Sequence, residues 1–539
     1  MRRAKLLGLS AIAVLLGGCG LLESLGSNPV DSRLATVEVA PPSIEPTPTP
    51  TPPEYTTYDV IVYGDELPGV CAAIWAKKAL GSDSKVVLVR PNASDALLGG
   101  LLTRGGLAYL DFDKTPRWYD QPYSQCFIEF LDKAEVVASC VHPVRGDRAI
   151  REMLAEAGVL LLSNAPLRPV VTEGRIEYAQ VLGYNSRLKA DSFIDATQNA
   201  ELAVAAGMPY YRGYESQSPE LATSTLATSI VPIVKGLTIE ELRSIEAKIH
   251  NDFPLTEQIV DSIYAEEDPQ TAGFWLSGFL QPLYQSYEDG YYFKSIAIGA
   301  AYHLDRDQPF SLEGFFWDKA NVCELDDEML SWNGFLFKYD VDSVMDIEEK
   351  GYQLTPEMVE EMAHVEEWLQ RHTDNPNVES IFPPEVYVRH SISVRDVVDP
   401  LSGQEILDGG TLPEQSIGTF SYDFDFRGGV DGLSIPIPPL PQYNFGIEHG
   451  LAKNIDNLAV TGRSAGYEGI AVSVGRINTV NVYHGQALGV AAALAKNTGV
   501  SLNSIRSAEV RQTLETLTGR TTLIQGISIR DGVDYSQIR

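Results

Sequence analysis

The sequence predicts an α/β fold with a parallel sheet at its core. Val60 to Tyr63 form a short apolar run, rich in β-branched residues, that is typical of a buried parallel strand. An alanine-rich stretch from Pro68 to Leu80, followed by Gly81, predicts a helix, and Lys85 to Val89 predict a second buried strand. A strand, a helix and a strand within about 30 residues form the unit that joins parallel strands. The chain has 539 residues, of which 44% are hydrophobic, so it can bury more than one core.

A tight turn follows the first of these strands. Gly64 allows the chain to turn sharply, and Gly69 allows the helix to pack closely on the strand while its N-terminal amides face a phosphate. Glu66 stands where such turns usually carry another glycine, and its charge hinders a phosphate there. Arg90 stands where an acid usually binds ribose hydroxyls, and an arginine there can indicate a 2′-phosphate. This unit alone leaves open a dinucleotide site or a purely structural crossover.

The N-terminus has the features of an export signal. It reads "MRRAKLLGLSAIAVLLGGCG", with a basic start and an apolar run from Leu6 to Leu16 that is too short to span a bilayer. The stretch that ends at Cys19 resembles the lipobox of bacterial lipoproteins, in which the cysteine is acylated. We therefore expect residues 1–18 to be a removed signal peptide and Cys19 to anchor the protein to a membrane of the bacterial cell envelope. An ordinary signal with an incidental cysteine is the alternative.

The segment 19–54 is expected to be a disordered linker, because its end alternates proline and threonine ("PPSIEPTPTPTPPE") and can neither pair into a sheet nor continue a helix. Acidic residues outnumber basic ones by 73 to 41, which gives a net charge of −32. Such a charge repels nucleic acids and other polyanions at long range, so we expect none of them as partners.

Four cysteines remain after Cys19. Cys126 and Cys140 are the pair closest in sequence, and an exported protein permits a disulfide between them, but spacing alone leaves that pairing open. Cys71 lies on the predicted helix and is interpreted as a small core residue. No spacing typical of metal ligands is present, so no metal site is predicted.

Three further stretches carry a family resemblance. They are "LLGGLLTRGGLAYLDFD" after the second strand, "FIDATQN" from Phe193, and "NIDNLAVTGRSAGYEGIAVSVGRINTVNVYHGQALGVAAALA" from Asn454. Together with the first turn they resemble the FAD-dependent oxidoreductase family with a glutathione-reductase-type flavin domain. The resemblance implies a Rossmann-like FAD-binding domain built from two separated segments, with an inserted α+β substrate or cap domain. It also implies FAD as the cofactor, and a hydride transfer from a small organic substrate to flavin N5.

The resemblance assigns cofactor contacts by matching motifs residue by residue. The residues assigned in this way are Gly64, Gly69, Arg90, Gly99, Gly100, Thr103, Gly106, Asp195, Thr197, Gly462, Arg463, Arg476, Gly485 and Gln486. The sequence departs from the family where Gln198 and Asn199 replace the usual Gly-Asp pair.

The same resemblance divides the chain. Residues 55–210 and 381–500 are expected to form the two segments of the FAD-binding domain, and residues 211–380, which are rich in aromatic side chains, the substrate domain. Residues 501–539 are expected to be a helical tail.

Oxidation next to a hydroxyl or amine also needs a base that removes the proton. His449 is the first candidate, with Tyr443 or His390 as helpers, because these residues precede expected flavin-binding elements. A lone histidine carries no geometry, so a structural role for each stays open.

Two other functions stay open at the sequence level. Glu66, Arg90 and Gln198 favour a non-catalytic lipoprotein that keeps the flavoenzyme fold as a binding or scaffolding module. An NADP-dependent enzyme would use Arg90 but leaves the Gly-Arg and Gly-Gln-Ala block near the C-terminus unexplained. The substrate and the electron acceptor are not identified by any motif.

Overall fold

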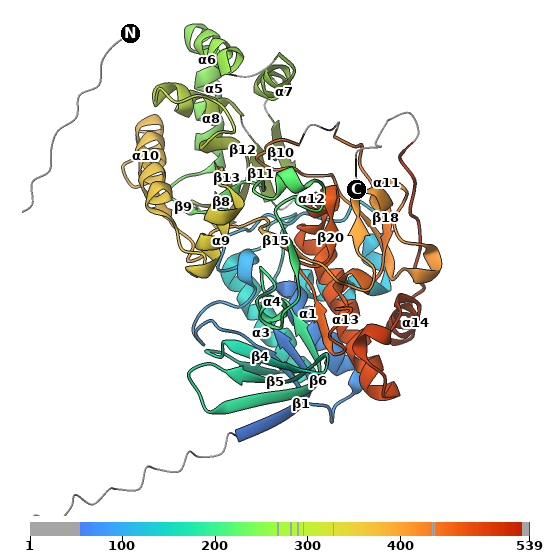
Figure 1. Cartoon of the computed structure of the whole chain (residues 1–539). Coiled ribbons are helices and arrows are strands. Elements are labelled where there is room, and N and C mark those ends of the chain that lie inside the picture. Colours follow the sequence, from blue (N-terminus) through green and yellow to red (C-terminus); the bar gives the residue numbers. More distant parts are fainter. Residues whose placement is uncertain are drawn as a thin grey trace, which may run out of the picture. The chain divides into compact units, whose positions relative to one another are not determined.

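A parallel sheet forms the core of the N-terminal half (Figure 1). Its central strand β1 (Glu54–Tyr63) pairs in parallel with β2 (Val86–Val89) on one side and with β6 (Ser186–Asp195) on the other. Strand β3 (Leu160–Leu162) extends the sheet beyond β2. Helix α1 (Leu67–Leu80) connects β1 and β2, so the predicted strand, helix and strand are confirmed, with β1 beginning earlier than the apolar run.

The structure is a computed structural model. It describes residues 54–539 except 267–268, 281–282, 288–289, 295, 327, 434, 436, 531–537 and 539. The expected signal peptide, Cys19 and nearly all of the linker therefore lie outside the described residues. Within the described part of the chain, no helix is both long enough and apolar enough to cross a membrane.

A short strand from the C-terminal half completes the sheet. Strand β19 (Leu458–Val460) pairs in parallel with the end of β6, and Val460 lies opposite Asp195. The beginning of β6 pairs instead with the antiparallel strand β5 (Arg175–Val181), which continues to β4 (Leu167–Thr172). Two segments far apart in the sequence thus share one sheet, because β6 is long enough to pair with different neighbours along its length.

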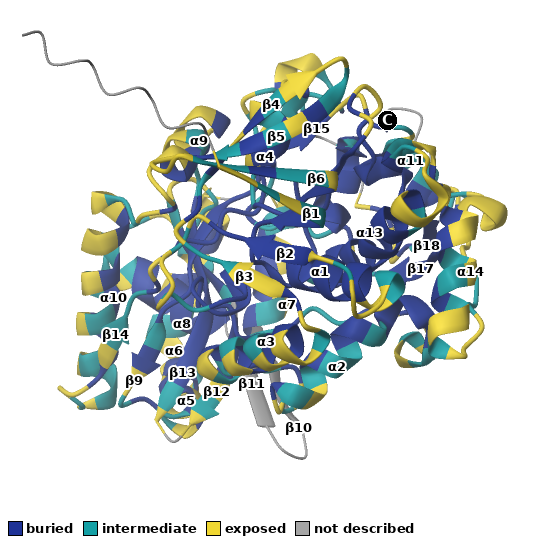
Figure 2. Cartoon of the chain, turned by 90° about the horizontal axis from the view of Figure 1, so that it is seen from below, coloured by how far each residue is buried: buried dark blue, intermediate teal, exposed yellow. Residues whose placement is uncertain are grey.

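Helix α13 (Asn478–Thr498) packs against α1 through glycines. A Cβ on Gly485 would lie 2.2 Å from the carbonyl oxygen of Pro68, and one on Gly489 would lie 2.1 Å from that of Ala72. The close approach of the two helices therefore depends on the absence of side chains there. Most of both helices, and strand β2 of the sheet, are buried in Figure 2.

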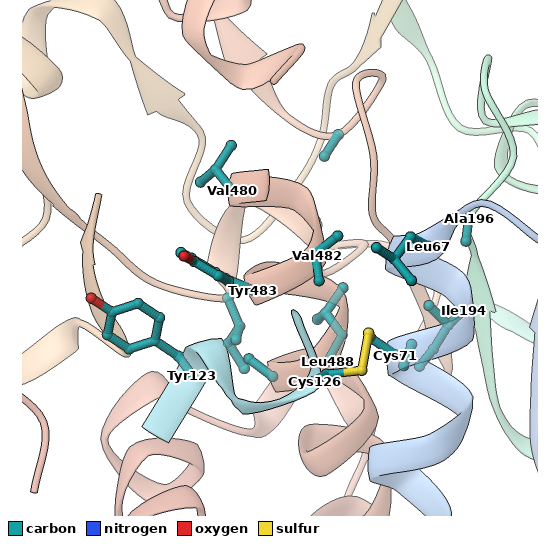
Figure 3. Close-up of a cluster of buried hydrophobic side chains, with 14 of the residues drawn as sticks. Leu67, Cys71, Tyr123, Cys126, Ile194, Ala196, Val480, Val482, Tyr483 and Leu488 are labelled. Carbon is teal, nitrogen blue, oxygen red and sulfur yellow. A yellow bond between two sulfur atoms is a disulfide. The ribbon is translucent and has the colours of Figure 1, made fainter. Parts of the chain in front are cut away.

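Two disulfides correct the sequence-based interpretation of the cysteines. Cys71 of α1 is bonded to Cys126 of α2 (Gln125–Lys133), and Cys140 is bonded to Cys323. Cys71 is therefore not a free core residue, and Cys126 does not pair with Cys140. The physical reason is tertiary, since α2 packs beside α1 and α13 (Figure 3) and brings Cys126 to a partner 55 residues away in the sequence.

Residues from Ala227 to Val388 in the sequence form a second hydrophobic core. It packs around an antiparallel sheet of β12 (Phe315–Asp326), β13 (Met329–Phe337), β9 (Ile233–Lys235), β14 (Glu379–Ile381) and β8 (Thr228–Ile230). Helices α5 (Ile239–Asn251), α8 (Ile296–Asp305) and α10 (Pro356–Thr373) contribute to the same core. The mixed α/β composition with a parallel sheet is confirmed, whereas the exact domain division stays a prediction.

The remaining elements are short or peripheral. The helices are α3 (Pro143–Ala157), α4 (Glu201–Ala205), α6 (Phe253–Glu266), α7 (Pro269–Leu280), α9 (Val341–Glu349), α11 (Gly403–Leu407), α12 (Val472–Gly475) and α14 (Ser507–Thr518). The strands are β7 (Tyr210–Arg212), β10 (Leu283–Tyr287), β11 (Gly290–Lys294), β15 (Ile392–Val394), β16 (Leu401–Ser402), β17 (Gly418–Ser421), β18 (Gln442–Phe445) and β20 (Tyr467–Glu468). In the described part of the expected helical tail, residues Leu502–Ser504 form a 3-10 turn and Ser507–Thr518 form α14, whereas residues 520–530 are not helical.

Candidate cofactor cradle and substrate chamber

The turn after β1 keeps the backbone geometry of a dinucleotide site. Gly64 has a φ of +108°, and a Cβ there would lie 2.5 Å from the carbonyl of Ala196 at the end of β6. A Cβ on Gly69 would lie 2.5 Å from the carbonyl oxygen of Gly64. Both glycines are therefore needed for the close packing that brings the N-terminus of α1 to the carboxyl edge of the sheet. We call the turn from Gly64 to Gly69, together with the loops after β2, β6 and β19 that contact it, the cradle.

The two predicted flavin-contacting segments meet at the cradle. The Ser464 hydroxyl donates to the carbonyl of Gln198 at 2.9 Å, and Nη1 of Arg463 donates to the side-chain oxygen of Gln198 at 2.9 Å and to the carbonyl of Val388 at 2.6 Å. The loop after β19 is thus fixed to the loop after β6. Gln198, a departure from the family motif, takes part in this contact directly.

The side chain of Glu66 fills the space above the start of α1. It is only 5% exposed, and its Oε1 accepts from Nη2 of Arg463 at 2.7 Å and from the backbone N–H of Leu101 at 3.4 Å. A Cβ on Gly100 would lie 2.5 Å from Cγ of Glu66. The carboxylate therefore joins the start of α1, which is expected to face a pyrophosphate, to the glycine-rich loop and Arg463, which are expected to contact the cofactor elsewhere.

Asp65 forms a second internal network. Its two oxygens accept from Arg104 Nη1 at 2.7 Å and Nη2 at 2.8 Å, and Arg90 Nη1 donates to it at 3.0 Å. Arg104 also pairs with Glu385 through Nε at 2.7 Å. Burial alone would lower the pKa of Arg104, but the carboxylates of Asp65 and Glu385 raise it above its ordinary value. The guanidinium of Arg104 thus stays charged and fully paired.

Arg90 has a structural role that the sequence did not show. It is fully buried, and besides Asp65 it donates to the hydroxyl of Ser163 at 2.9 Å and to the carbonyls of Ala93 and Ala96 at 2.8 and 3.0 Å. Its donors hold the loop after β2 and do not line the neighbouring cavity. The interpretation of Arg90 as a contact to a ribose or 2′-phosphate is therefore corrected, and the NADP alternative loses the residue on which it rested.

A cavity of about 500 Å³ opens beside the cradle, and its wall is acidic. Glu201, Glu348 and Glu349 line it, and no Lys, Arg or His of the described residues lies within ion-pair distance of these three carboxylates. Burial raises the pKa of Glu348 to about 7, and burial together with Asp195 raises the pKa of Glu201 to about 7. Protonation thus reduces the negative charge of this cavity at neutral pH.

A larger cavity of about 1,090 Å³, which we call the chamber, lies between the two cores. Its polar wall includes Asp111, Asp113, Tyr387, Arg389, Asp425 and Arg476. Arg476 pairs with Asp425 at 2.5 Å, and its Nη1 donates to the hydroxyl of Tyr387 at 3.0 Å. Among the residues assigned from motifs, Arg476 is the one that lines the chamber.

The predicted catalytic residues lie in the core and line neither cavity. His449 is 2% exposed and stacks on His484, with the two ring centroids 4.0 Å apart. Burial, and to a smaller extent the charge of His484, lowers the pKa of His449 well below its ordinary value. His390 is fully buried, with Nε2 3.0 Å from the Ser393 hydroxyl, and burial lowers its pKa to about 3. Tyr443 is also fully buried. Position in the sequence next to an expected flavin element did not determine where these side chains point.

Several motif residues support the cradle from behind. Gln486 accepts from the N–H of Cys126 and donates to the carbonyl of Pro122, each at 2.8 Å. Asp195 accepts from the N–H groups of Thr197 and Ala203. Gly99, Thr103 and Gly106 shape the backbone of the loop after β2, and Gly462, with a φ of +100°, turns the chain after β19. Arg104, Asp113, Glu385 and Tyr387 were missed, because no local motif marks them.

The sequence matches the family model described as FAD dependent oxidoreductase over residues 59–514, and the chain belongs to this family. FAD is the cofactor of the family, so the prediction of FAD is confirmed. No curated protein matches the sequence.

The chain is also similar to several solved structures. A geranylgeranyl bacteriochlorophyll reductase-like protein from Thermoplasma acidophilum has 10% identity and a TM-score of 0.34, over 86% of this chain and 83% of that one. The flavin-dependent brominase Bmp2 has 10% identity and a TM-score of 0.37, over 86% and 84%. The halogenase PltM in complex with phloroglucinol and FAD has 11% identity and a TM-score of 0.35, over 82% and 71%. These likenesses are too distant to carry a functional argument.

The cradle fits FAD in its backbone and in its donors, with one side chain in the way. Arg463, the N–H of Leu101 and the first turn of α1 form a donor set suited to a pyrophosphate. Two of these donors, Arg463 and the N–H of Leu101, serve the carboxylate of Glu66, whereas the first turn of α1 makes no side-chain hydrogen bond to it. The whole set would be available to a pyrophosphate only with Glu66 turned away from Arg463.

Proposed function

We propose that the chain is an FAD-dependent oxidoreductase with a glutathione-reductase-type flavin domain, which oxidises a small organic substrate in the chamber. One observation carries the proposal. Tyr387 lines the chamber and links it to the cradle, because its hydroxyl accepts from Arg476 of the chamber at 3.0 Å and its ring centroid lies 5.9 Å from the guanidinium carbon of Arg463 in the cradle. When bound, FAD supplies the acceptor for a hydride at its N5.

In the cradle, the chain's own residues bind and position the cofactor. Arg463, the N–H of Leu101 and the start of α1 would hold the pyrophosphate after Glu66 has moved. The Asp65 network keeps the neighbouring loop in place and offers the cofactor no free cation.

In the chamber, we assign the proton-accepting role to Asp113 in place of His449. Asp113 lines the chamber, its Oδ1 accepts from the N–H groups of Thr115 at 2.8 Å and Ser421 at 3.0 Å, and burial raises its pKa to about 7. A carboxylate with such a pKa is half ionised at neutral pH and can accept a proton from a substrate hydroxyl or amine. Phe112 and Phe424 give the chamber apolar surface from which a bound substrate would displace water.

The visible spectrum tests this function. Protein that begins at residue 55 is purified, mixed with FAD, separated from free cofactor and exposed anaerobically to a panel of alcohols, amines, sugars and carboxylates. A flavin spectrum that bleaches with one of these classes supports the oxidoreductase. Protein that remains colourless with saturating FAD contradicts it.

A second function, a ligand-binding module without catalysis, is favoured by the Glu66–Arg463 ion pair and by the unpaired acids of the cradle cavity. Protein that binds FAD but bleaches with no substrate class would support this module.

We further propose that the protein is exported and anchored through Cys19. The two disulfides support the proposal, because disulfides persist in oxidising compartments outside the cytosol. The substitution Cys19→Ser should move the protein from the membrane fraction to the soluble fraction of fractionated cells. An unchanged distribution would contradict the anchor.

A further inference from the structure

Arg389 lies on the wall of the chamber in a fixed orientation. It is 1% exposed, its guanidinium carbon lies 4.4 Å from the ring centroid of Tyr387, and Nη1 donates to the carbonyl of Ala227 at 2.6 Å and to the hydroxyl of Ser229 at 2.8 Å. One nitrogen is thus used to anchor the side chain, and the planar group is held against an aromatic face.

The charge of Arg389 has no partner among the described residues. The two nearby carboxylates already pair with other arginines, Asp425 with Arg476 and Asp318 with Arg427, each at 2.5 Å. No described carboxylate lies within 4 Å of the Arg389 guanidinium, and its Nε makes no hydrogen bond to a described residue.

Such a buried cation is energetically unfavourable. Burial, together with the positive charges of Arg476 and Arg427, lowers the pKa of Arg389 to about 9, although Tyr387 and Asp425 oppose the shift. A buried charge that lacks a counter-ion costs stability, and an anion that enters the chamber would remove this cost.

We propose that Arg389 binds the carboxylate of the substrate, and that the substrate is a small carboxylic acid with an apolar or aromatic body. The planar guanidinium matches the two oxygens of a carboxylate. The chamber holds about 1,090 Å³, and Phe112, Trp275, Leu336 and Phe424 give it apolar walls. This inference rests on the proposed function only in treating the chamber as the substrate site.

Benzoate is the probe, with benzamide as its uncharged match and inorganic phosphate as the competing kind of anion. Binding is measured by calorimetry and by thermal shift, on protein without FAD and with FAD added. The variants are Arg389→Gln, which removes the charge, and Arg389→Lys, which keeps the charge but loses the planar group that can donate to both oxygens of a carboxylate. Arg395→Gln, an exposed arginine in the same segment, is the control.

We expect benzoate to bind the wild type and the control variant alike, and to bind Arg389→Gln more than 10-fold more weakly, with Arg389→Lys in between. Benzamide should bind as weakly to the wild type as benzoate does to Arg389→Gln. Any one of four results would overturn the proposal. Benzoate and benzamide could bind the wild type equally, or phosphate could bind it more strongly than benzoate. Benzoate could fail to bind the wild type, or it could bind Arg389→Gln as well as it binds the wild type. If Arg389→Gln does not fold, the same comparison with Arg389→Lys decides.

The two proposals fail separately. Arg389-dependent binding of benzoate without any flavin bleaching would leave the carboxylate site in place and contradict the oxidoreductase. Bleaching by substrates that lack a carboxylate, at a rate unaffected in Arg389→Lys, would contradict the carboxylate site and leave the oxidoreductase in place.

Discussion

Replacement of Glu66 should tighten the binding of FAD. The Glu66 carboxylate lies 2.7 Å from Arg463 and accepts from the N–H of Leu101, so it competes with a pyrophosphate for the same donors. Glu66→Gln keeps the size of the side chain and removes its charge. Glu66→Gly removes both, and restores the residue that such turns usually carry.

The magnitude follows from the charge that a bound pyrophosphate would meet. Two like charges about 4 Å apart repel by about 1 kcal/mol in water and by about 4 kcal/mol at the effective dielectric constant of a protein surface. Because 1.4 kcal/mol corresponds to a factor of ten, Glu66→Gln should lower the Kd for FAD roughly 5-fold to several hundred-fold. Glu66→Gly should lower it at least as much, since the space next to Gly100 also opens.

Without FAD, both variants should be less stable than the wild type. They leave Arg463 buried without its carboxylate, and removal of one partner of a buried ion pair typically costs about 3–5 kcal/mol. FAD should therefore raise their melting temperature more than that of the wild type.

The assay is titration of FAD followed by quenching of its fluorescence and by calorimetry. Glu349→Gln is the matched control, because Glu349 lines the same cavity, is exposed and has no ion pair with a described cation. Its Kd should change by less than about twofold. The reasoning is refuted if the wild type already binds FAD tightly and Glu66→Gln binds it equally well or more weakly.

Three further predictions concern the chamber and the scaffold. The pKa of Asp113 is raised from 3.8 to about 7 in the folded protein, so folding favours the protonated carboxyl. This contribution to the free energy of unfolding is fully present below about pH 4 and is lost as the pH rises through 7. Asp113→Asn should therefore be more stable than the wild type at pH 8, and it should also abolish turnover. Its free energy of unfolding is measured with urea at pH 5 and pH 8. A variant less stable than the wild type at pH 8 would contradict the raised pKa. Replacement of Cys140 and Cys323 by serine removes a disulfide that closes a loop of 183 residues, so it should lower the free energy of unfolding by on the order of 5 kcal/mol in the same assay. A double variant as stable as the wild type would show that this disulfide does not form. Gly485→Ala places a methyl group 2.2 Å from a carbonyl oxygen of α1 and should cost about 1–3 kcal/mol, whereas Gly273→Ala, at an open helical position, should cost little. A similar loss in both glycine variants would show that close packing is not the cause.

The local elements and the family follow from short stretches of the sequence. The apolar run at Val60 and the alanine-rich stretch after Pro68 predict β1 and α1, because alternation, helix formers and terminating glycines act over a few residues. Gly64 and Gly69 were also correctly placed at a tight turn, since their conformational freedom is a local property.

The contacts between side chains that are far apart in the sequence could not be predicted and are seen only in the folded chain. Glu66 finds Arg463 almost 400 positions later in the sequence, and Cys71 finds Cys126 because two helices pack side by side. His449, which sequence position made the first candidate base, faces the core, whereas Arg389 faces the chamber without a counter-charge. Such partnerships depend on how the elements pack, and packing is a property of the whole chain that no short stretch of sequence contains.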